Sequence, residues 1–250
     1  MLLAANKLTK RFGGITALND FSVDLNKGEV LGIVGDNGAG KSTLLKILSG
    51  TYDATSGAVK IEDHESSFNN PSDAQLKGIE MVYQDLALCD DLSAAANIYL
   101  GREPLTRSGL VNHAAILDGA TQLLGELNSD ARPNTPVRLL SGGQRQAVAI
   151  ARTLITRPKI LLLDEPTAAI SVRQIEEVLQ MIRRLKAAGT AIMLITHRLP
   201  DVFEVCDRVV VLRHGNKIAD KAVSQSSLEE LNALITGAKE AAKPLRPVLQ

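Results

Sequence analysis

The sequence has few cysteines, no excess of charge and no long apolar run, and each shortage excludes a class of protein. Cys89 and Cys206 are the only cysteines among 250 residues. They lie far apart and in no metal-ligand spacing, which indicates two reduced thiols in a cytosolic protein. Lysine plus arginine equals aspartate plus glutamate at 28 each, so the basic excess typical of nucleic-acid-binding proteins is missing.

No apolar stretch approaches the roughly 18 consecutive residues that a membrane-spanning helix needs. The first seven residues, Met1 to Lys7, contain too few apolar side chains for a secretory signal. We therefore expect any role at a membrane to come through a partner. The composition that remains, 45% hydrophobic and 22% charged, is that of an ordinary globular protein with a substantial core.

Four short apolar runs predict strands that are buried on both faces, as in a parallel sheet covered by helices. Amphipathic helical patterns lie between them, and one pattern ends at Gly189, a residue suited to a helix C-terminus. Strands that alternate with helices indicate a doubly wound α/β core. The four runs are Val30 to Val34, Ile79 to Tyr83, Ile160 to Leu163 and Ala191 to Ile195.

Two further patterns predict β structure outside these runs. Phe21, Val23 and Leu25 alternate with polar residues, which predicts a smaller antiparallel sheet beside the core. A hairpin is expected from Arg208 to Ala219, around the turn residues Gly215 and Asn216.

The rest of the chain predicts an insertion and a tail. Residues 86–156, between the second and third core strands, indicate helices joined by a proline-containing loop, and we expect an inserted helical subdomain. Residues 2–237 then form a single domain. Residues 238–250 contain two prolines and are expected to be a flexible C-terminal tail.

The segment that follows the first core strand matches the phosphate-binding, or P-loop, pattern G-x-x-x-x-G-K-[ST] in full. It also precedes a helical run, as the pattern requires. Its glycines let backbone N–H groups and the helix N-terminus point at phosphate oxygens. Lys41 is expected to reach the β- and γ-phosphates, and Ser42 to hold Mg²⁺. The residues expected to bind the nucleotide are Gly35, Asp36, Asn37, Gly38, Ala39, Gly40, Lys41, Ser42 and Thr43.

Two adjacent carboxylates, Asp164 and Glu165, follow the run Ile160 to Leu163. The carboxyl ends of strands face the ligand crevice in open α/β sheets, so both are expected beside the phosphates. Adjacent residues of an extended chain point in different directions, which predicts two different roles. Asp164 would contact Mg²⁺, and Glu165 would orient and deprotonate the attacking water.

A second glycine-containing motif, Leu140-Ser141-Gly142-Gly143-Gln144, precedes an apolar helical stripe. Ser141 and Gln144 have the spacing of a capping box, which predicts a helix start with bare N–H groups at the glycines. Capping alone would favour a surface helix without function. These five residues are, however, the hallmark of ABC-type ATPases, and they lie between the P-loop and the strand-end acids as in that family.

The resemblance to ABC-type ATPases extends over residues 2–237. It implies an α/β fold, a P-loop NTPase core with a flanking antiparallel β subdomain and an inserted helical subdomain. Gln84 resembles the glutamine of this family that senses Mg²⁺ and the γ-phosphate, and His197 resembles the switch histidine that contacts the γ-phosphate. Phe12 stands where the family places an aromatic ring that stacks on adenine.

The resemblance also implies that two chains work together. Ser141, Gly142, Gly143 and Gln144 of one chain would close on the ATP held by the P-loop of a second copy, which gives a head-to-tail dimer with two nucleotides. ATP binding would favour the closed dimer, and hydrolysis would release it. One departure is Ser171, which replaces the usual aspartate; we expect it to affect the coupling of the two sites and not hydrolysis itself.

Further segments resemble bacterial importers of monosaccharides such as ribose, xylose and fructose, and most resemble the fructose type. This implies a homodimeric ATPase at the cytoplasmic face of the bacterial inner membrane, with permease subunits bound near Gln84 to Asp91, a periplasmic sugar-binding protein in the same system, and no nucleic acid. The alternatives are an ATPase for another solute, such as branched-chain amino acids, and a non-transport ABC-type ATPase. The segments are Arg11 to Leu18, Met81 to Asp85, Leu86 to Ser93, Asn97 to Glu103 and Glu165 to Ala169.

Three other classes of this superfamily fit the sequence less well. A DNA-repair or chromosome ATPase would carry a very long coiled coil between the P-loop (Gly35 to Thr43) and the signature motif (Leu140 to Gln144). A ribosome-associated factor would carry two ATPase halves, whereas this sequence has one P-loop and one signature. A non-catalytic regulatory subunit would be expected to have lost Lys41, Glu165 or His197, and all three are present.

Overall fold

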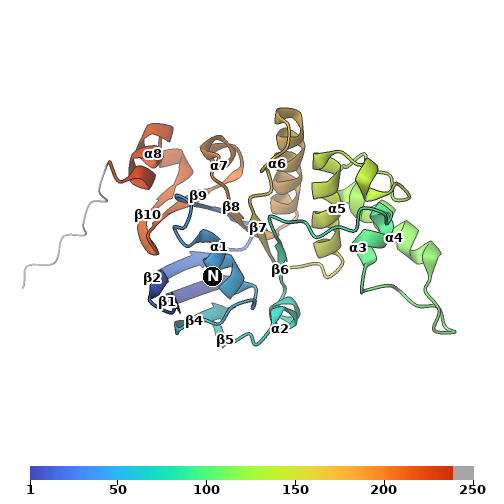
Figure 1. The fold of residues 1–250 in the computed structure, drawn as a ribbon, viewed down its shortest axis with the longest axis horizontal. Coiled ribbons are helices and arrows are strands. Elements are labelled where there is room, and N and C mark those ends of the chain that lie inside the picture. Colours follow the sequence, from blue (N-terminus) through green and yellow to red (C-terminus); the bar gives the residue numbers. More distant parts are fainter. Residues whose placement is uncertain (239–250) are drawn as a thin grey trace, which may run out of the picture.

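A computed structural model of the chain describes residues 1–238 (Figure 1). The flexible tail expected over 238–250 lies outside the described residues, apart from its first position. Both cysteines are free, Cys89 at the surface and Cys206 buried. No helix in the described part is both long and apolar enough to cross a membrane.

A six-stranded sheet forms the centre of the molecule, in the order β10-β9-β3-β8-β7-β6. Strands β9 to β6 are parallel, and β10 is antiparallel to β9. All residues of β3, β6, β7 and β8 are buried, as their mainly apolar runs predict, and the α/β core is confirmed; the buried residues include the charged Glu80 in β6 and Asp164 at the end of β7. The strands are β3 Val30–Val34, β6 Ile79–Val82, β7 Ile160–Asp164, β8 Ala191–Ile195, β9 Arg208–Arg213 and β10 Asn216–Ala222.

A four-stranded antiparallel sheet, in the order β2-β1-β4-β5, flanks this core. The alternation of Phe21, Val23 and Leu25 predicted β2 correctly, and all three side chains are buried. The predicted hairpin is also confirmed, although its first strand β9 joins the main sheet beside β3. The strands of the smaller sheet are β1 Leu3–Phe12, β2 Ile15–Leu25, β4 Ser56–Ile61 and β5 His64–Ser66.

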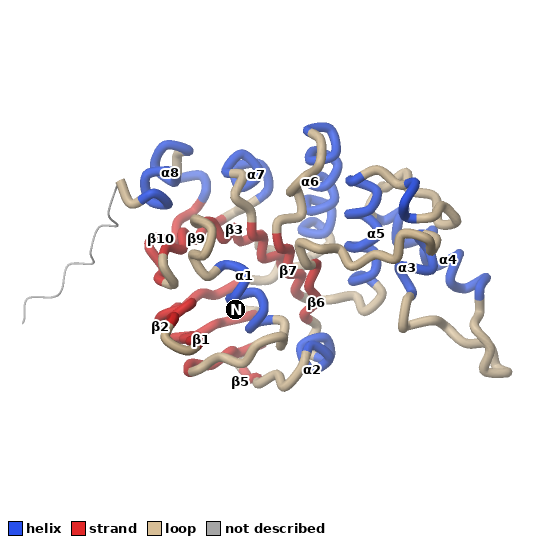
Figure 2. The backbone as a smooth tube through the Cα atoms, in the orientation of Figure 1, coloured by secondary structure: helices blue, strands red, loops and turns tan. Residues whose placement is uncertain are grey.

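Helices cover both faces of the main sheet. Figure 2 shows α5, α6, α7 and α8 in a row over one face, with α1 and the antiparallel sheet on the other. The helices are α1 Lys41–Leu48, α2 Pro71–Leu76, α3 Ala94–Tyr99, α4 His113–Glu126, α5 Gly142–Leu154, α6 Val172–Ala187, α7 Leu199–Val205 and α8 Leu228–Thr236, with 3-10 turns at Val137–Leu139 and Val223–Gln225.

Strand β7 divides the hydrophobic core into two clusters, because its successive side chains point to opposite faces. Leu161 and Leu163 pack in the cluster of α5, α6 and α7. Ile160 and Leu162 pack in the cluster that α1 shares with the antiparallel sheet. All four are fully buried, and each contributes about 1.5–3 kcal/mol to the hydrophobic stabilisation of the sheet. The end of β7 is therefore held firmly where it delivers the two carboxylates.

The segment 86–156 contains α3, α4 and α5, as expected for a helical insertion. Apolar residues of all three helices belong to the same cluster as α6 and α7, so the insertion packs onto the core and does not stand apart from it. Figure 1 shows α3 and α4 at the end of the molecule away from α8. The exact limits 86–156 and 2–237 stay a prediction.

Candidate functional site

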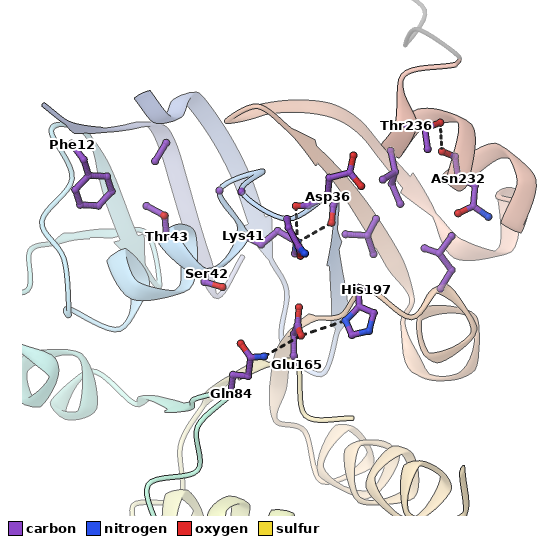
Figure 3. Close-up of a pocket in the computed structure, with 18 residues that line it drawn as sticks. Phe12, Asp36, Lys41, Ser42, Thr43, Gln84, Glu165, His197, Asn232 and Thr236 are labelled. Carbon is purple, nitrogen blue, oxygen red and sulfur yellow. Dashed lines mark hydrogen bonds and ion pairs between the residues drawn. The ribbon is translucent and has the colours of Figure 1, made fainter. Parts of the chain in front are cut away.

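A cavity of about 830 Å³ lies at the carboxyl ends of the parallel strands (Figure 3). Strand β3 leads into the glycine-rich loop, β6 into Gln84, β7 into Glu165 and β8 into His197. Such strand ends are where open α/β sheets bind ligands. The structure therefore brings together predicted residues that are up to 185 positions apart in the sequence, from Phe12 to His197. Of the predicted loop residues, all but the buried Ala39 line the cavity.

Two glycines of the loop are required by close backbone contacts. A Cβ atom on Gly35 would lie 2.1 Å from the carbonyl oxygen of Leu212, and one on Gly40 would lie 2.4 Å from that of Ala17. Gly40 also has a φ of 108° and precedes α1 without any side-chain cap. The first N–H groups of α1 thus remain available to an anion, and the helix dipole favours negative charge there.

Lys41 is the first residue of α1, its side chain reaches back to the loop, and it is 6% exposed. Its Nζ donates hydrogen bonds to the carbonyl oxygens of Gly35 at 2.8 Å and Asp36 at 2.9 Å. Burial lowers the pKa of Lys41, although nearby carboxylates, Glu165 foremost, oppose this. A buried ammonium group that gains only carbonyl partners is a favourable site for a phosphate oxygen.

Asp164 is 5% exposed at the end of β7, and its Oδ1 accepts a hydrogen bond of 3.3 Å from the hydroxyl of Ser42. Burial raises the pKa of Asp164, while the Ser42 hydrogen bond opposes the shift. Mg²⁺ takes oxygen ligands and retains several waters, so a hydroxyl and a carboxylate side by side next to phosphates fit this ion. The amide oxygen of Gln84, at the cavity wall, is the third predicted ligand.

Glu165 is the centre of the three predicted catalytic residues. Its Oε2 lies 3.5 Å from Nε2 of Gln84 and 3.3 Å from Nδ1 of His197 (Figure 3). The backbone at Glu165 is left-handed, with a φ of 51°, and its N–H donates to the carbonyl oxygen of Ile195 at 3.0 Å. We predicted different surroundings for Asp164 and Glu165 because adjacent side chains of an extended chain point in different directions. The structure shows another cause: the backbone turns at Glu165 into the left-handed conformation.

Phe12, the last residue of β1, lines the cavity on the side away from α8 (Figure 3). Its ring is 43% exposed and meets the ring of Tyr52 edge-on, with 5.5 Å between centroids. The ammonium group of Lys10 lies 5.1 Å from the centroid of the Phe12 ring. An exposed and well-supported ring at this position is compatible with stacking on a base, which stays a prediction.

Sequence reasoning missed the part of the cavity wall that α7 and α8 supply. Leu199, Asn232, Ile235 and Thr236 line it together with Ala17 and Val34. A signal for α8 was present, because Ser227 caps the helix through the N–H of Glu230 and Gly237 ends it in a left-handed conformation. No local pattern indicates that this helix returns to the P-loop.

The start of α5 is the predicted capping box, which the structure confirms. The Ser141 hydroxyl accepts from the N–H of Gln144 at 3.2 Å, and the Ser141 N–H donates to Oε1 of Gln144 at 2.9 Å. A Cβ atom on Gly142 would lie 2.7 Å from Cγ2 of Ile170, and one on Gly143 would lie 2.8 Å from Oε2 of Glu177. The glycines therefore also allow α5 to approach the start of α6 closely.

The signature residues and the P-loop belong to different hollows of the described chain. Gly143 and Gln144 line a separate hollow of about 210 Å³, and none of the residues from Ser141 to Gln144 lines the large cavity. A single chain thus does not bring its own signature to its own P-loop.

Ser171, the departure noted in the sequence, begins α6. Its N–H donates to Oε1 of Gln174 at 3.0 Å, and its hydroxyl accepts from the N–H of Gln174, so the two residues form a second capping box. Serine and aspartate cap helices about equally well. The substitution therefore keeps the start of α6 in place.

Comparison with known proteins gives a family and close relatives. Residues 18–168 match the family model described as ABC transporter. The chain is 42% identical to the xylose/arabinose import ATP-binding protein of Sulfolobus acidocaldarius, over 94% of each chain. It is 40% identical to the fructose import ATP-binding protein of Rhizobium meliloti, over 96% of this chain and 95% of the relative.

Some relatives are about twice as long as this chain. The galactose/methyl galactoside import ATP-binding protein of Treponema denticola is 36% identical over 95% of this chain, which spans 48% of that relative.

Two solved structures resemble the fold closely. One is a nucleotide-free ATP-binding cassette of an ABC transporter, with a TM-score of 0.81 and 27% identity, over 94% of this chain and 95% of that one. The other is a dimeric cassette in a post-hydrolysis state with ADP and Pi, with a TM-score of 0.75 and 26% identity, over 89% of this chain and 99% of that one.

Proposed function

The chain belongs to the ABC transporter family of ATP-hydrolysing subunits, and from this premise we propose that it powers the import of a monosaccharide. The observation that carries the proposal is the convergence of Gln84, Glu165 and His197 beside the P-loop, with both contacts to Oε2 of Glu165 within 3.5 Å. The full-length likeness to import subunits for xylose/arabinose and for fructose supports the solute class.

In the proposed reaction, the P-loop N–H groups and Lys41 hold the phosphates of ATP. Ser42, Gln84 and Asp164 would hold Mg²⁺, and the ion would supply positive charge that offsets the negative charge of the phosphates. Oε2 of Glu165 orients a water molecule and takes one of its protons while the water oxygen bonds to the γ-phosphorus. The bond to the β–γ bridging oxygen breaks, and ADP and phosphate leave. A positioned general base of this kind contributes about 10²–10⁴-fold.

The remaining predicted residues complete the proposed nucleotide site. His197 would contact the γ-phosphate and hold Glu165, and Phe12 would stack on adenine. Ser141 to Gln144 of a second copy would close over the γ-phosphate, because the chain's own signature lies outside the cavity. The dimeric cassette with ADP and Pi among the structural relatives supports this arrangement.

The proposed partners are transmembrane permease subunits, a periplasmic sugar-binding protein and the second copy, at the cytoplasmic face of the inner membrane. The loop Gln84 to Asp91, which would receive the permease, is mostly exposed, and a hollow of about 240 Å³ lies beside it. The exposed apolar side chain of Leu100 lines this hollow, and the exposed Leu92 directly follows the loop in the sequence. No nucleic acid is part of the proposal.

Trapping the closed dimer tests the nucleotide chemistry. Glu165→Gln should retain ATP binding and accumulate as an ATP-dependent dimer in size-exclusion chromatography, because the base is lost while the clamp remains. Lys41→Ala should stay monomeric, because it loses nucleotide affinity. A Glu165→Gln protein that hydrolyses ATP at the wild-type rate would refute the role of Glu165.

Uptake by intact cells tests the solute. A strain whose gene carries Glu165→Gln should lose uptake of labelled ribose, xylose or fructose while uptake of branched-chain amino acids is unchanged. Loss of amino-acid uptake alone would overturn the monosaccharide proposal and leave the ATPase in place.

A further inference from the structure

Two hydrogen bonds join the loop that carries Glu165 to the elements before and after His197, one to the end of β8 and one to α7. On one side, the N–H of Glu165 donates to the carbonyl oxygen of Ile195 at 3.0 Å. On the other, the hydroxyl of Thr167 donates to Oδ2 of Asp201 at 2.6 Å. Neither Thr167 nor Asp201 lines the cavity, so any effect of this second bond reaches the reaction through other residues.

The Thr167–Asp201 bond is buried, which makes it costly to break. Asp201 is 2% exposed and Thr167 is 4% exposed. The other carboxylate oxygen of Asp201 accepts from Nε of Arg198 at 3.2 Å, and the N–H of Arg198 donates to the hydroxyl of Thr196 at 3.0 Å. A buried carboxylate must be satisfied by such donors, since an unpaired one is strongly destabilising. The turn around His197 is therefore fixed to Asp201 at one end of α7.

The loop after β7 needs an external constraint. Glu165 and Ala169 both have positive φ angles, 51° and 58°, which side chains other than glycine rarely adopt. Such conformations persist where the surroundings hold them, and they occur often at functional sites. Thr167 lies midway between these two residues, and its hydroxyl is the atom that anchors this loop to α7.

We propose that Asp201 is a positioning residue for hydrolysis. By accepting the hydrogen bond from the Thr167 hydroxyl, it holds the loop that contains Glu165 against the turn that contains His197. The 3.3 Å separation between Oε2 of Glu165 and Nδ1 of His197 depends on this junction. The inference rests on the proposed function, because it assumes that Glu165 and His197 act together on ATP.

Removing only the hydroxyl tests the junction. Thr167→Val keeps the shape of the side chain, and Leu199 and Val202 still anchor α7 in the core. We expect kcat to fall about 10-fold or more, because small displacements of reacting groups cost this much. Nucleotide affinity, measured with Glu165→Gln as the common background, should change less than about twofold. Thr167→Ser restores the donor and should restore most of kcat.

A double-mutant cycle separates positioning from general loosening. If the bond acts through the Glu165–His197 pair, Thr167→Val should lower kcat little further in a His197→Ala background. If the fold-losses of kcat in Thr167→Val and His197→Ala multiply in the double variant, the two residues act independently and the proposal is overturned. Asp201→Asn should lower kcat in the same direction; if that variant does not fold, Thr167→Val decides, since it leaves the Asp201–Arg198 pair in place.

Thr153→Val is the matched control. Thr153 is also buried, at 5% exposure, and its hydroxyl donates to the carbonyl oxygen of Ile150 within α5 at 2.7 Å. Thr153→Val should lose some thermal stability and keep wild-type kcat, which would show that removing a buried threonine hydroxyl does not by itself slow hydrolysis. Wild-type kcat in Thr167→Val would contradict the positioning role. Absence of hydrolysis in the wild-type protein would instead contradict the proposed function.

Discussion

Lys41 lines the cavity and Asp164 lies behind it, in contact with the lining residue Ser42, and burial shifts the pKa values of Lys41 and Asp164 in opposite directions. The pKa of Lys41 is lowered and that of Asp164 is raised, so burial disfavours the charged form of each. Phosphate and Mg²⁺ would supply the missing counter-charges. The buried charges of Lys41 and Asp164 therefore lower the folding stability of the nucleotide-free protein, and this loss would be offset when nucleotide and Mg²⁺ bind.

Asp164→Asn should raise the thermal stability of the nucleotide-free protein at pH 7–8. A raised pKa means that the folded state binds the proton more tightly than the unfolded state, so stability falls as pH rises from the usual aspartate range through the raised pKa. Asparagine removes this loss and can still accept from Ser42. Each kcal/mol gained should raise Tm by about 2–4 °C, measured by circular dichroism.

The same variant should lose Mg²⁺-dependent hydrolysis, and added MgATP should stabilise it less than the wild-type protein. An unchanged or lower Tm at pH 7–8 would show that the buried charge of Asp164 costs nothing in the free protein.

The sequence predicted the residues of the P-loop but not the conformation of Glu165. A P-loop is a local pattern, in which the glycines, the lysine and the following helix are contiguous. The left-handed turn at Glu165 depends on a bond to Ile195, a residue 30 positions away, which no local pattern records.

At the scale of elements, the start of α6 explains how the chain tolerates Ser171. The spacing Ser171 to Gln174 repeats the spacing Ser141 to Gln144, and both pairs form capping boxes. A capping box was recognised at Ser141 because glycines and the family signature mark that helix start, and the same rule applied to Ser171 would have predicted α6 to begin where it does.

Ser171→Ala should cost about 1 kcal/mol of stability, because the first turn of α6 loses its side-chain cap. Ser171→Asp should leave stability within a few tenths of a kcal/mol, since aspartate caps as well as serine. Urea denaturation of the two variants side by side measures this. Equal losses in both would mean that the hydroxyl, and not capping in general, is required.

Among the strands, those that sequence patterns missed are short or irregular. Strands β4 and β5 have mixed burial, and β1 contains register shifts against both of its neighbours, so alternation is lost. The mainly apolar runs of β3, β6, β7 and β8 gave clear signals because both faces are buried, even though β6 contains the charged residue Glu80.

At the scale of the whole molecule, the separation of the signature from the P-loop cavity is the decisive feature. Ser141→Ala should abolish hydrolysis while a single chain still binds ATP, because the lost hydroxyl belongs to the partner's site in the dimer. Binding is measured with a fluorescent nucleotide and hydrolysis by phosphate release. Parallel loss of binding in the monomer would indicate that Ser141 serves its own chain.

The most direct test of the account is the rate of phosphate release per chain as a function of chain concentration, with Glu165→Gln as the blank. If two chains build each active site, the rate per chain rises with concentration and is absent from the blank. A constant rate per chain, from protein shown to be monomeric at those concentrations, would contradict the shared site and the role in trans of Ser141 to Gln144.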